Sequence, residues 1–492
     1  MKRILLSVFM VLCVAQLASA QTGVRIFGAQ QFMLDDNNIA NPKVYLSQNL
    51  GSLGIDNSGV VSAITFPSAC ALLDLRSTTK GFLPPRMNSV QEIAVCGGTP
   101  TEGLMVYNTT SHTLDVYNGT LWGAIAPSWG LSGNTGTTPA TNFLGTIDNV
   151  ALFIQVKNGA IVNNSFILNT NGSIQRDNAG NARGLSAVDL QIVRGSVTQV
   201  ASGSNSFIGG GQNNSSTNTL STVGGGINNN ASGVGSFIGG GGFDGITVSG
   251  NTAGGGASVV GGGLTNSASG IQSVVGGGQN NRATNNNATV GGGVNNNASG
   301  FGAFIGGGGY NGAAATGNTA SGNASVVSGG FANIAQADYS SVIGGRDALA
   351  SQFGQMAQSS GAFATQGDAQ TSVFILRKQS PNAVPVSLAL DGGATKIVVP
   401  TNGAYTFHAL IVGKTQGSPA TVGGWEITGL IYNNAGTATI VGANITRIYN
   451  TPAGWGLPTV TGSGTNMDVQ VIGAVGTTID WVASVHTSDV VF

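Results

Sequence analysis

Charge is what this sequence most lacks. Of 492 residues, 18 are lysine or arginine and 19 are aspartate or glutamate, so charged residues make up 8% and the net charge is −1. A protein that tracks a phosphate backbone needs clustered basic residues, and no such cluster is present. Disordered tails with many like charges are excluded for the same reason. We therefore expect no nucleic-acid partner.

Cysteine and helix-length apolar runs are also scarce. One of the three cysteines, Cys13, lies in residues 1–20. This segment has a basic start, then an apolar run and then Ala-Ser-Ala, which is the pattern of a cleaved signal peptide. We therefore expect a secreted or cell-surface protein, in which Cys70 and Cys96 either form a disulfide or remain two buried thiols. No later run of about 18 apolar residues indicates a membrane-spanning helix.

Catalytic patterns are equally sparse. The three histidines, His112, His408 and His486, are spread singly and show neither metal-ligand spacing nor a triad partner, so each is expected to be a solvated strand residue. The repeats carry almost no carboxylates for a glycosidase pair, and the glycine runs lack the lysine of a phosphate loop. The sequence thus predicts no cofactor, no metal site and no enzymatic activity.

Glycine, in contrast, is abundant, and many of the 80 glycines belong to one phrase repeated between residues 201 and 345. The repeats are 15 residues apart, except for two spacings of 22 and a last one of 16. Such self-similarity predicts a parallel β-roll or solenoid, with one rung per repeat. One aliphatic residue precedes each glycine run: Ile208, Val223, Ile238, Val260, Val275, Val290, Ile305, Val327 and Ile343.

Aligned on this aliphatic residue, the rungs form columns. A serine or alanine lies two positions earlier, for example Ser206 in the first rung and Ser341 in the last. Because side chains alternate in an extended chain, the aliphatic and small residues are expected inside, with glycines at the corners. Asparagines six positions later are expected to form an amide ladder along the stack: Asn214, Asn229, Asn266, Asn281, Asn296 and Asn333.

The two long repeats carry matching insertions of seven residues after an aromatic. Loops that leave a repeat coil often carry binding sites. The candidate ligand-binding residues are therefore Phe243 and Asp244 in one loop and Tyr310 and Asn311 in the other, with a glycan or a protein as ligand. Alternatively, each aromatic packs on the roll and closes its loop.

The flanking segments differ from the repeats in composition. Turn dipeptides and alternating apolar residues predict a small N-terminal β module and a C-terminal antiparallel β-sandwich. Between them we expect a linker with strands that cap the open edge of the stack, and a neck after it. The boundaries are 1–20 for the signal peptide, 21–126 for the N-terminal module, 127–200 for the linker and caps, 201–345 for the array, 346–380 for the neck and 381–492 for the sandwich.

Two further residue types have structural interpretations. Trp425, Trp455 and Trp481 are expected in the core of the sandwich rather than as sugar platforms. Asp368 follows a glycine in the neck and is expected to close a turn onto its own backbone.

The repeat pattern SxVxGGxxNxASG resembles the head repeats of trimeric autotransporter adhesins and the repeated segments of phage tail-fibre proteins. The phrase ALLDLRSTTKGFLPPRM (Ala71–Met87) resembles a module of secreted bacterial and tail-fibre-like proteins, and the C-terminal segment resembles domains of phage structural proteins. The resemblance implies a left-handed roll of three parallel chains. Independently, one aliphatic residue per rung buries little apolar area, so a shared axis would enlarge the core.

The chain also departs from these families. The sequence shows no heptads, no set of four lipid-facing strands and no helical segment typical of a self-cleaving domain. We therefore expect neither the coiled-coil stalk and membrane barrel of the autotransporters nor the self-cleaving C-terminal domain of many tailspikes. We predict an all-β, homotrimeric or filament-forming fibre that is structural or adhesive and binds a surface glycan or protein. One alternative is a polysaccharide-active β-helix enzyme. Another is an ice- or mineral-binding solenoid, which would need a regular outward array of threonines.

Overall fold

The computed structural model describes five short strands between residues 23 and 76 and residues 80–125, 144–155, 165–417, 419–449 and 452–492. In this part of the chain, helix is limited to α2 (Ser89–Ala94) and the 3-10 turn η2 (Val95–Gly98), which confirms the all-β prediction. None of the described helices is long and apolar enough to cross a membrane. The chain divides into two compact units, Met1–Leu144 and Gly145–Phe492.

The first unit contains two small sheets. In one, β1 (Gly23–Phe27), β2 (Gln31–Asp35), β3 (Lys43–Ser47) and β4 (Ser52–Asp56) are antiparallel neighbours, and β5 (Leu73–Arg76) joins β4 in parallel. The other sheet contains, in this order, β6 (Arg86–Met87), β7 (Met105–Asn108), β8 (Thr113–Tyr117) and β9 (Trp122–Ala124). Helix α2 begins after Asn88, which forms a capping box with Gln91.

A buried carboxyl pair lies between α2 and the second sheet. Asn108 Nδ2 donates a hydrogen bond to Glu92 Oε2. Glu92 Oε1 and Asp115 Oδ1 are buried and have no hydrogen-bond partner among the described residues. Burial, and secondly the neighbouring Asp115, raise the pKa of the Glu92 carboxyl.

This raised pKa predicts a pH dependence. The folded unit holds the Glu92 proton more tightly than the unfolded chain, so its contribution to stability is complete at acidic pH and is lost as the pH rises through the raised pKa. Glu92→Gln, which stays neutral, is expected to stabilise the unit more at pH 7 than at pH 4. Hydrogen exchange of the β7 amides at both pH values measures this, with Glu102→Gln at an exposed glutamate as control. Equal effects at both pH values would contradict it.

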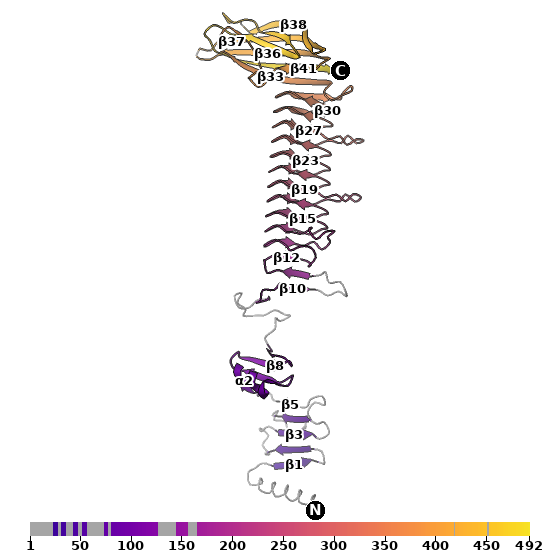
Figure 1. The fold of residues 1–492 in the computed structure, drawn as a ribbon, viewed down its shortest axis with the longest axis vertical. Coiled ribbons are helices and arrows are strands. Elements are labelled where there is room, and N and C mark those ends of the chain that lie inside the picture. The colour runs from indigo at the N-terminus through magenta and orange to yellow at the C-terminus, as the bar shows by residue number, and fades with distance from the viewer. Residues whose placement is uncertain are drawn as a thin grey trace, which may run out of the picture. The chain divides into compact units, whose positions relative to one another are not determined.

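The second unit contains the predicted parallel solenoid (Figure 1). It opens with the antiparallel pair β10 (Leu152–Gln155) and β11 (Ser165–Leu168), followed by β12 (Ile174–Gln175). From β12 onward the strands stack in parallel, first with β13 (Val188–Asp189) and then with one strand of each repeat. The solenoid prediction is therefore confirmed, and the parallel stacking begins ahead of the repeated phrase.

Each rung adds one two-residue strand to each of two parallel sheets. The sheet that buries the aliphatic residue, here the valine sheet, continues through β14 (Phe207–Ile208), β16 (Thr222–Val223), β18 (Phe237–Ile238), β20 (Val259–Val260), β22 (Val274–Val275), β24 (Thr289–Val290), β26 (Phe304–Ile305), β28 (Val326–Val327), β30 (Ser341–Arg346) and β32 (Met356–Ser360). The other, here the alanine sheet, consists of β15 (Ser215–Ser216), β17 (Asn230–Ala231), β19 (Thr252–Ala253), β21 (Ser267–Ala268), β23 (Arg282–Ala283), β25 (Asn297–Ala298), β27 (Thr319–Ala320), β29 (Ile334–Ala335) and β31 (Leu349–Ala350).

Four inward side chains per rung fill the narrow interior. In the rung of Val275 these are Ser273, Val275, Asn281 and Ala283, all with 0% exposed surface. The same positions are buried in the neighbouring rungs, and together they form one continuous core. The inward asparagines are hydrogen-bonded, as buried polar groups generally are. The inward serines differ, because the hydroxyls of Ser206, Ser236, Ser258 and Ser325 are buried without a partner among the described residues.

Three corners with positive φ close each rung. In the rung of Val275 they lie at Gln272 (φ 57°), Gly278 (φ 86°) and Asn280 (φ 54°). A Cβ at Gly278 would lie 2.1 Å from the carbonyl oxygen of Gly293 in the next rung. Glycine is therefore required there by its backbone conformation and by the close approach of the rungs.

The buried asparagines join each rung to the next. Asn281 Oδ1 accepts the backbone N–H of Asn296 at 3.0 Å, while its Nδ2 donates to the carbonyl oxygens of Gly277 at 2.8 Å and Gly293 at 2.7 Å. The bonds thus run mainly from side chain to backbone rather than from amide to amide. The column holds the six asparagines of the sequence alignment together with Asn251 and Asn318, which the insertions displaced from the alignment.

The last predicted rung has a different register. Val342, and not Ile343, pairs with Val327 and is fully buried, whereas Ile343 is 53% exposed. The inward small residue is accordingly Ser340 rather than Ser341. The predicted spacing of 16 was therefore wrong, because a shift of one residue moves a side chain to the other face of a strand.

The asparagine column gives a stability prediction. Asn281→Ala leaves the Asn296 N–H and the Gly277 and Gly293 carbonyls without their buried partner, so we expect a loss of about 3 kcal/mol or more in the free energy of unfolding. Asn230→Ala removes an outward-facing asparagine of β17 and is expected to change it by less than about 0.5 kcal/mol. Urea unfolding of both variants measures the difference, and equal losses would contradict a role for the column.

Two antiparallel sheets follow the coil. The larger consists of β33 (Ala369–Ser380), β36 (Gly403–Thr415), β37 (Val422–Asn434), β38 (Thr437–Tyr449) and β41 (Ile479–Val491), and it joins the valine sheet where β33 pairs with β32. The smaller consists of β34 (Pro385–Ser387), β40 (Asn466–Ile472) and β35 (Ile397–Val398), with β39 (Thr459–Ser463) paired to β40. Side chains from both sheets form one core.

The three tryptophans lie in this shared core. Trp425, Trp455 and Trp481 are at most 8% exposed, and their ring centroids are 5.0 to 6.1 Å apart. Trp481 Nε1 donates to Ser380 Oγ at 2.8 Å. The prediction that they are core residues rather than sugar platforms is confirmed.

Candidate functional site

The two insertions form matching loops that project from the coil (Figure 1). Both leave the rung at the same corner, between a left-handed glycine (Gly241 or Gly308) and the next ladder asparagine (Asn251 or Asn318). The loops are four rungs apart, which corresponds to roughly 19 Å along the stack. They therefore present their tips on one side of the coil.

The four candidate residues of these loops divide into two kinds. Asp244 Oδ1 accepts the backbone N–H groups of Ile246 and Thr247, and Asn311 Oδ1 accepts those of Ala313 and Ala314. The two bonds to Asp244, the one from Thr247 most of all, lower the pKa of its carboxyl. Asp244 and Asn311 thus shape the turns at the loop tips.

The loop aromatics remain open to solvent. Phe243 is 51% exposed and Tyr310 is 59% exposed, with the Tyr310 hydroxyl donating to the carbonyl oxygen of Gly312 at 3.0 Å. Each ring belongs to its own loop, so the four candidate residues are not brought together at one place. Ligand binding by these residues stays a prediction.

The cysteine prediction is only half covered by the structure. Cys96 is exposed, so it is not the buried thiol of the second alternative, and it has no disulfide partner among the described residues. Cys70 lies outside the described residues, so the disulfide between them stays a prediction.

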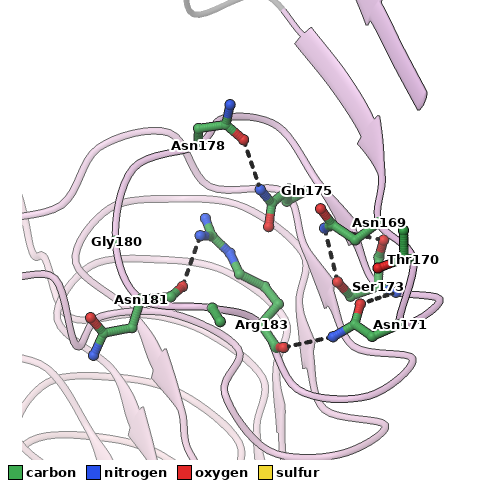
Figure 2. Close-up of a pocket in the computed structure, with 10 residues that line it drawn as sticks. Asn169, Thr170, Asn171, Ser173, Gln175, Asn178, Gly180, Asn181 and Arg183 are labelled. Carbon is green, nitrogen blue, oxygen red and sulfur yellow. Dashed lines mark hydrogen bonds between the residues drawn. The ribbon is translucent and has the colours of Figure 1, made fainter. Parts of the chain in front are cut away.

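A cleft of about 310 Å³ opens at the start of the parallel stack (Figure 2). The turn between β11 and β12 and the loop after β12 supply its walls, which are mostly polar. It is lined by Asn169, Thr170, Asn171, Ser173, Gln175, Asn178, Gly180, Asn181, Ala182 and Arg183. Sequence reasoning missed this site, because these residues precede the repeats and match no known motif.

Hydrogen bonds within the walls orient the amides of the cleft. Asn169 Nδ2 donates to Ser173 Oγ at 2.9 Å, and Asn171 Nδ2 donates to the carbonyl oxygen of Arg183 at 3.0 Å. Gln175 Nε2 donates to Asn178 Oδ1 at 3.3 Å (Figure 2).

Several amide groups of the cleft keep their bonding capacity. Among the described residues, no partner is present for Asn169 Oδ1, Gln175 Oε1, Asn178 Nδ2 or the side-chain amide of Asn181. These acceptors and donors are therefore available to a ligand.

A buried ionic network supports the floor of the cleft. The Arg183 guanidinium contacts Asp189 at 2.9 Å and Asp177 at 3.2 Å, and Arg194 contacts the same carboxylates at 3.0 and 2.8 Å. All four side chains are at most 7% exposed. Burial lowers the pKa of Arg183, although a guanidinium stays protonated in proteins. Two positive and two negative charges cancel, so this network leaves no net charge at the cleft.

The network predicts a large cost for removing one partner. Asp189→Asn leaves the guanidiniums of Arg183 and Arg194 buried with a single carboxylate, and we expect a loss of about 3–5 kcal/mol in local stability. Hydrogen exchange at β13 measures it, with Asp148→Asn at an exposed aspartate as control. Unchanged exchange in Asp189→Asn would show that the network is not needed to hold this end of the coil.

Two of the histidines are less isolated than the sequence indicated. His408 of β36 lies opposite His486 of β41, and His408 Nε2 lies 2.9 Å from Glu426 Oε1, although without the alignment of a hydrogen bond. No sequence pattern indicated the contact between His408 and Glu426, because only the pairing of β36 with β37 brings these two residues together. The described residues include no group of three or more His, Cys, Asp or Glu able to hold a metal ion.

Asp368 has the predicted structural role. Its carboxylate accepts the backbone N–H groups of Phe363, Ala364 and Thr365. The interpretation of this residue as a turn-closing aspartate is confirmed.

The comparisons with known proteins point to phage tails. Residues 60–140 match the family described as "Phage tail like trimerisation region", which confirms the resemblance to phage tail-fibre proteins. No curated protein matches the chain.

Three solved structures that match are tailspikes of Acinetobacter phages. The tailspike gp49 of Acinetobacter baumannii bacteriophage Fri1, a capsular polysaccharide depolymerase, is 9% identical with a TM-score of 0.17, over 68% of this chain and 75% of that one. The tailspike of Acinetobacter baumannii phage AM24 is 11% identical with a TM-score of 0.18, over 62% and 67%. That of Acinetobacter phage vB_ApiP_P1 is 10% identical with a TM-score of 0.15, over 65% and 74%.

One prediction is corrected by these matches. The sequence predicted that the chain is not an enzyme, because no catalytic pattern was visible in the repeats. A capsular polysaccharide depolymerase among the matched tailspikes contradicts that prediction.

Proposed function

We propose that this chain is a trimeric tail-type fibre that binds a surface glycan in the amide-lined cleft at the start of its coil. The observation that carries the proposal is the chemistry of the cleft, which combines oriented amides with no net charge in the supporting network. The trimer is supported by the match of residues 60–140 to a trimerisation region.

The cleft suits a ligand rich in hydroxyl groups. A sugar hydroxyl both donates and accepts hydrogen bonds, and Asn178 Nδ2 and Gln175 Oε1 offer one group of each kind. Because the amides are already oriented by Ser173, Asn178 and the Arg183 carbonyl, a ligand loses little free energy in ordering them. An anionic ligand would find no uncompensated positive charge in the ionic network.

A trimer would multiply this site. Three chains carry three clefts, and a polysaccharide with many repeats can engage them together, so that weak single contacts add up to tight attachment. The adhesive role that the sequence predicted then requires no large apolar pocket. We also propose that the protein is secreted, on the strength of the signal-peptide pattern in residues 1–20.

Binding can be tested with the full chain and purified capsular polysaccharides. Asn178→Ala and Asn181→Ala remove exposed amides of the cleft, and each is expected to weaken binding by about 3- to 10-fold, the value of one or two hydrogen bonds. The matched control is Asn230→Ala, which removes an outward asparagine of β17 and should leave binding unchanged. Biolayer interferometry on immobilised polysaccharide measures all three, and unaltered binding in both cleft variants would contradict the proposal.

The projecting loops are the rival site. The double variant Phe243→Ala/Tyr310→Ala removes both exposed rings and leaves Asp244 and Asn311 to form their turns. Weakened binding in this variant, with unaltered binding in the cleft variants, would place the glycan at the loops instead.

Cleavage of the bound glycan is the second candidate function, because one of the matched tailspikes is a depolymerase. The same mixtures, followed by size-exclusion chromatography of the polysaccharide, report it directly. A decrease in polymer size that disappears in the cleft variants would make the fibre a polysaccharide-active enzyme.

A further inference from the structure

One side of the coil is apolar on its outer surface. Outward residues of the valine sheet lie one position before each buried aliphatic residue, and most of them are apolar. They are Phe207, Phe237, Val259, Val274, Phe304, Val326 and Met356, with Thr222, Thr289 and Ser341 in the remaining rungs. The three phenylalanines are 37 to 42% exposed, which is unusual for rings in such a regular row.

The corner that leads into the valine sheet continues this apolar surface. Five apolar side chains there, in different rungs, are each more than half exposed: Leu220, Val234, Ile271, Phe301 and Tyr339. We call this row together with the outward column of the valine sheet the apolar ridge.

The alanine sheet shows the opposite character. In its first seven strands the outward residues are polar: Ser215, Asn230, Thr252, Ser267, Arg282, Asn297 and Thr319. In its last two strands the outward residues are the apolar Ile334 and Leu349. Since both sheets belong to the same rungs, stacking alone does not require an apolar outer face on one of them. A contiguous exposed apolar surface of this kind marks an interaction site.

We propose that the apolar ridge is the surface on which copies of this chain pack, parallel and in register around a common axis. This proposal rests on the proposed trimer and assigns its contact surface within the coil. A second copy fits this surface because its ridge repeats at the same interval of one rung, so that contacts made in one rung recur along the stack.

The charge of the ridge favours identical partners. No ridge residue is charged, so equal copies meet without repulsion. Asp338, which precedes the ridge residue Tyr339 in the sequence, accepts hydrogen bonds from the backbone and side-chain nitrogens of Asn323 and is thereby engaged within its own chain.

The dimensions also fit a stable interface. Ten strands of the valine sheet at roughly 4.8 Å each extend over about 43 Å, and one side of a rung, about five residues of 3.3 Å, is roughly 16 Å wide. The resulting face of roughly 700 Å² is divided between two neighbours around the axis, so three copies together bury roughly 2,100 Å², which exceeds the roughly 1,000 Å² that a biological interface needs.

The corner row alternates between bulky and small residues. The bulky residues Ile271 and Phe301 alternate with rungs that carry Gly256 and Ala257, or Asn286 and Asn287, at the same corner. In register, the bulky residues of the copies meet at one level, and the intervening rungs leave room for them above and below.

Cross-linking of the full chain tests the assignment. In a Cys13→Ser/Cys70→Ser/Cys96→Ser background, Ile271→Cys places a thiol on the ridge, and Ser267→Cys places one on the alanine sheet, in the preceding strand β21. After mild oxidation we expect covalent dimers from Ile271→Cys and none from Ser267→Cys, on gels run without reductant. Light scattering of the same reduced samples gives the mass, and their melting curves verify that both variants fold.

The outcomes separate the ridge from the trimer. A trimeric mass without cross-links at Ile271→Cys, or with cross-links at Ser267→Cys, overturns the ridge and leaves the trimer standing. A monomeric mass overturns both, while glycan binding is measured separately. As a second readout, Phe304→Lys should lower the melting temperature of the coil by several degrees and Thr252→Lys should not. Both substitutions lie at outward positions, so a coil without partners would tolerate them equally. Equal melting temperatures of the two variants would therefore also overturn the ridge.

Discussion

The hydrogen bond from each asparagine side chain to the backbone of the next rung is the interaction on which the coil depends. Backbone hydrogen bonds join each rung to the next along both strands and at the corners, but they leave the N–H of a ladder asparagine such as Asn296 without a backbone partner. Asn281 supplies what is missing, because its carbonyl oxygen serves the N–H of Asn296 and its amino group serves the carbonyls of Gly277 and Gly293. The glycine corners can turn so tightly because this amide satisfies the backbone groups that they leave behind.

The ladder also explains why the rest of the interior is so simple. With the backbone groups of the corner satisfied by the asparagine, one aliphatic residue, one alanine and one small serine or alanine are enough to fill the remainder of each rung. The outer surface is then free to differ from side to side, polar on the alanine sheet and apolar on the ridge. The cleft likewise satisfies its buried polar groups within the chain. The charges of the buried arginines and aspartates cancel one another, and amide side chains line the cleft.

Periodicity made the coil predictable, and its interruptions mark where prediction failed. Ladder members Asn251 and Asn318 were missed because the insertions displaced them from the repeat alignment, although the chain returns to the same column after each loop. At Val342 and Ile343 two aliphatic residues stand side by side, so either could face inward, and only the pairing with Val327 decides. The cleft could not be inferred at all, because Gln175, Asn178 and Arg183 belong to no repeat and are brought together by the first parallel strands. His408 and Glu426 likewise meet only through strand pairing.

The valine sheet ends in antiparallel partners on both sides, β11 before its first parallel strand and β33 after its last. An added or deleted repeat therefore leaves both terminal pairings intact and changes only the number of rungs between them. Each such event moves the cleft and the C-terminal sheets apart or together by roughly 4.8 Å, the spacing of two strands. The number of repeats in the gene therefore sets the length of the coil. That length can change in steps of one rung without any change in the segments at its two ends.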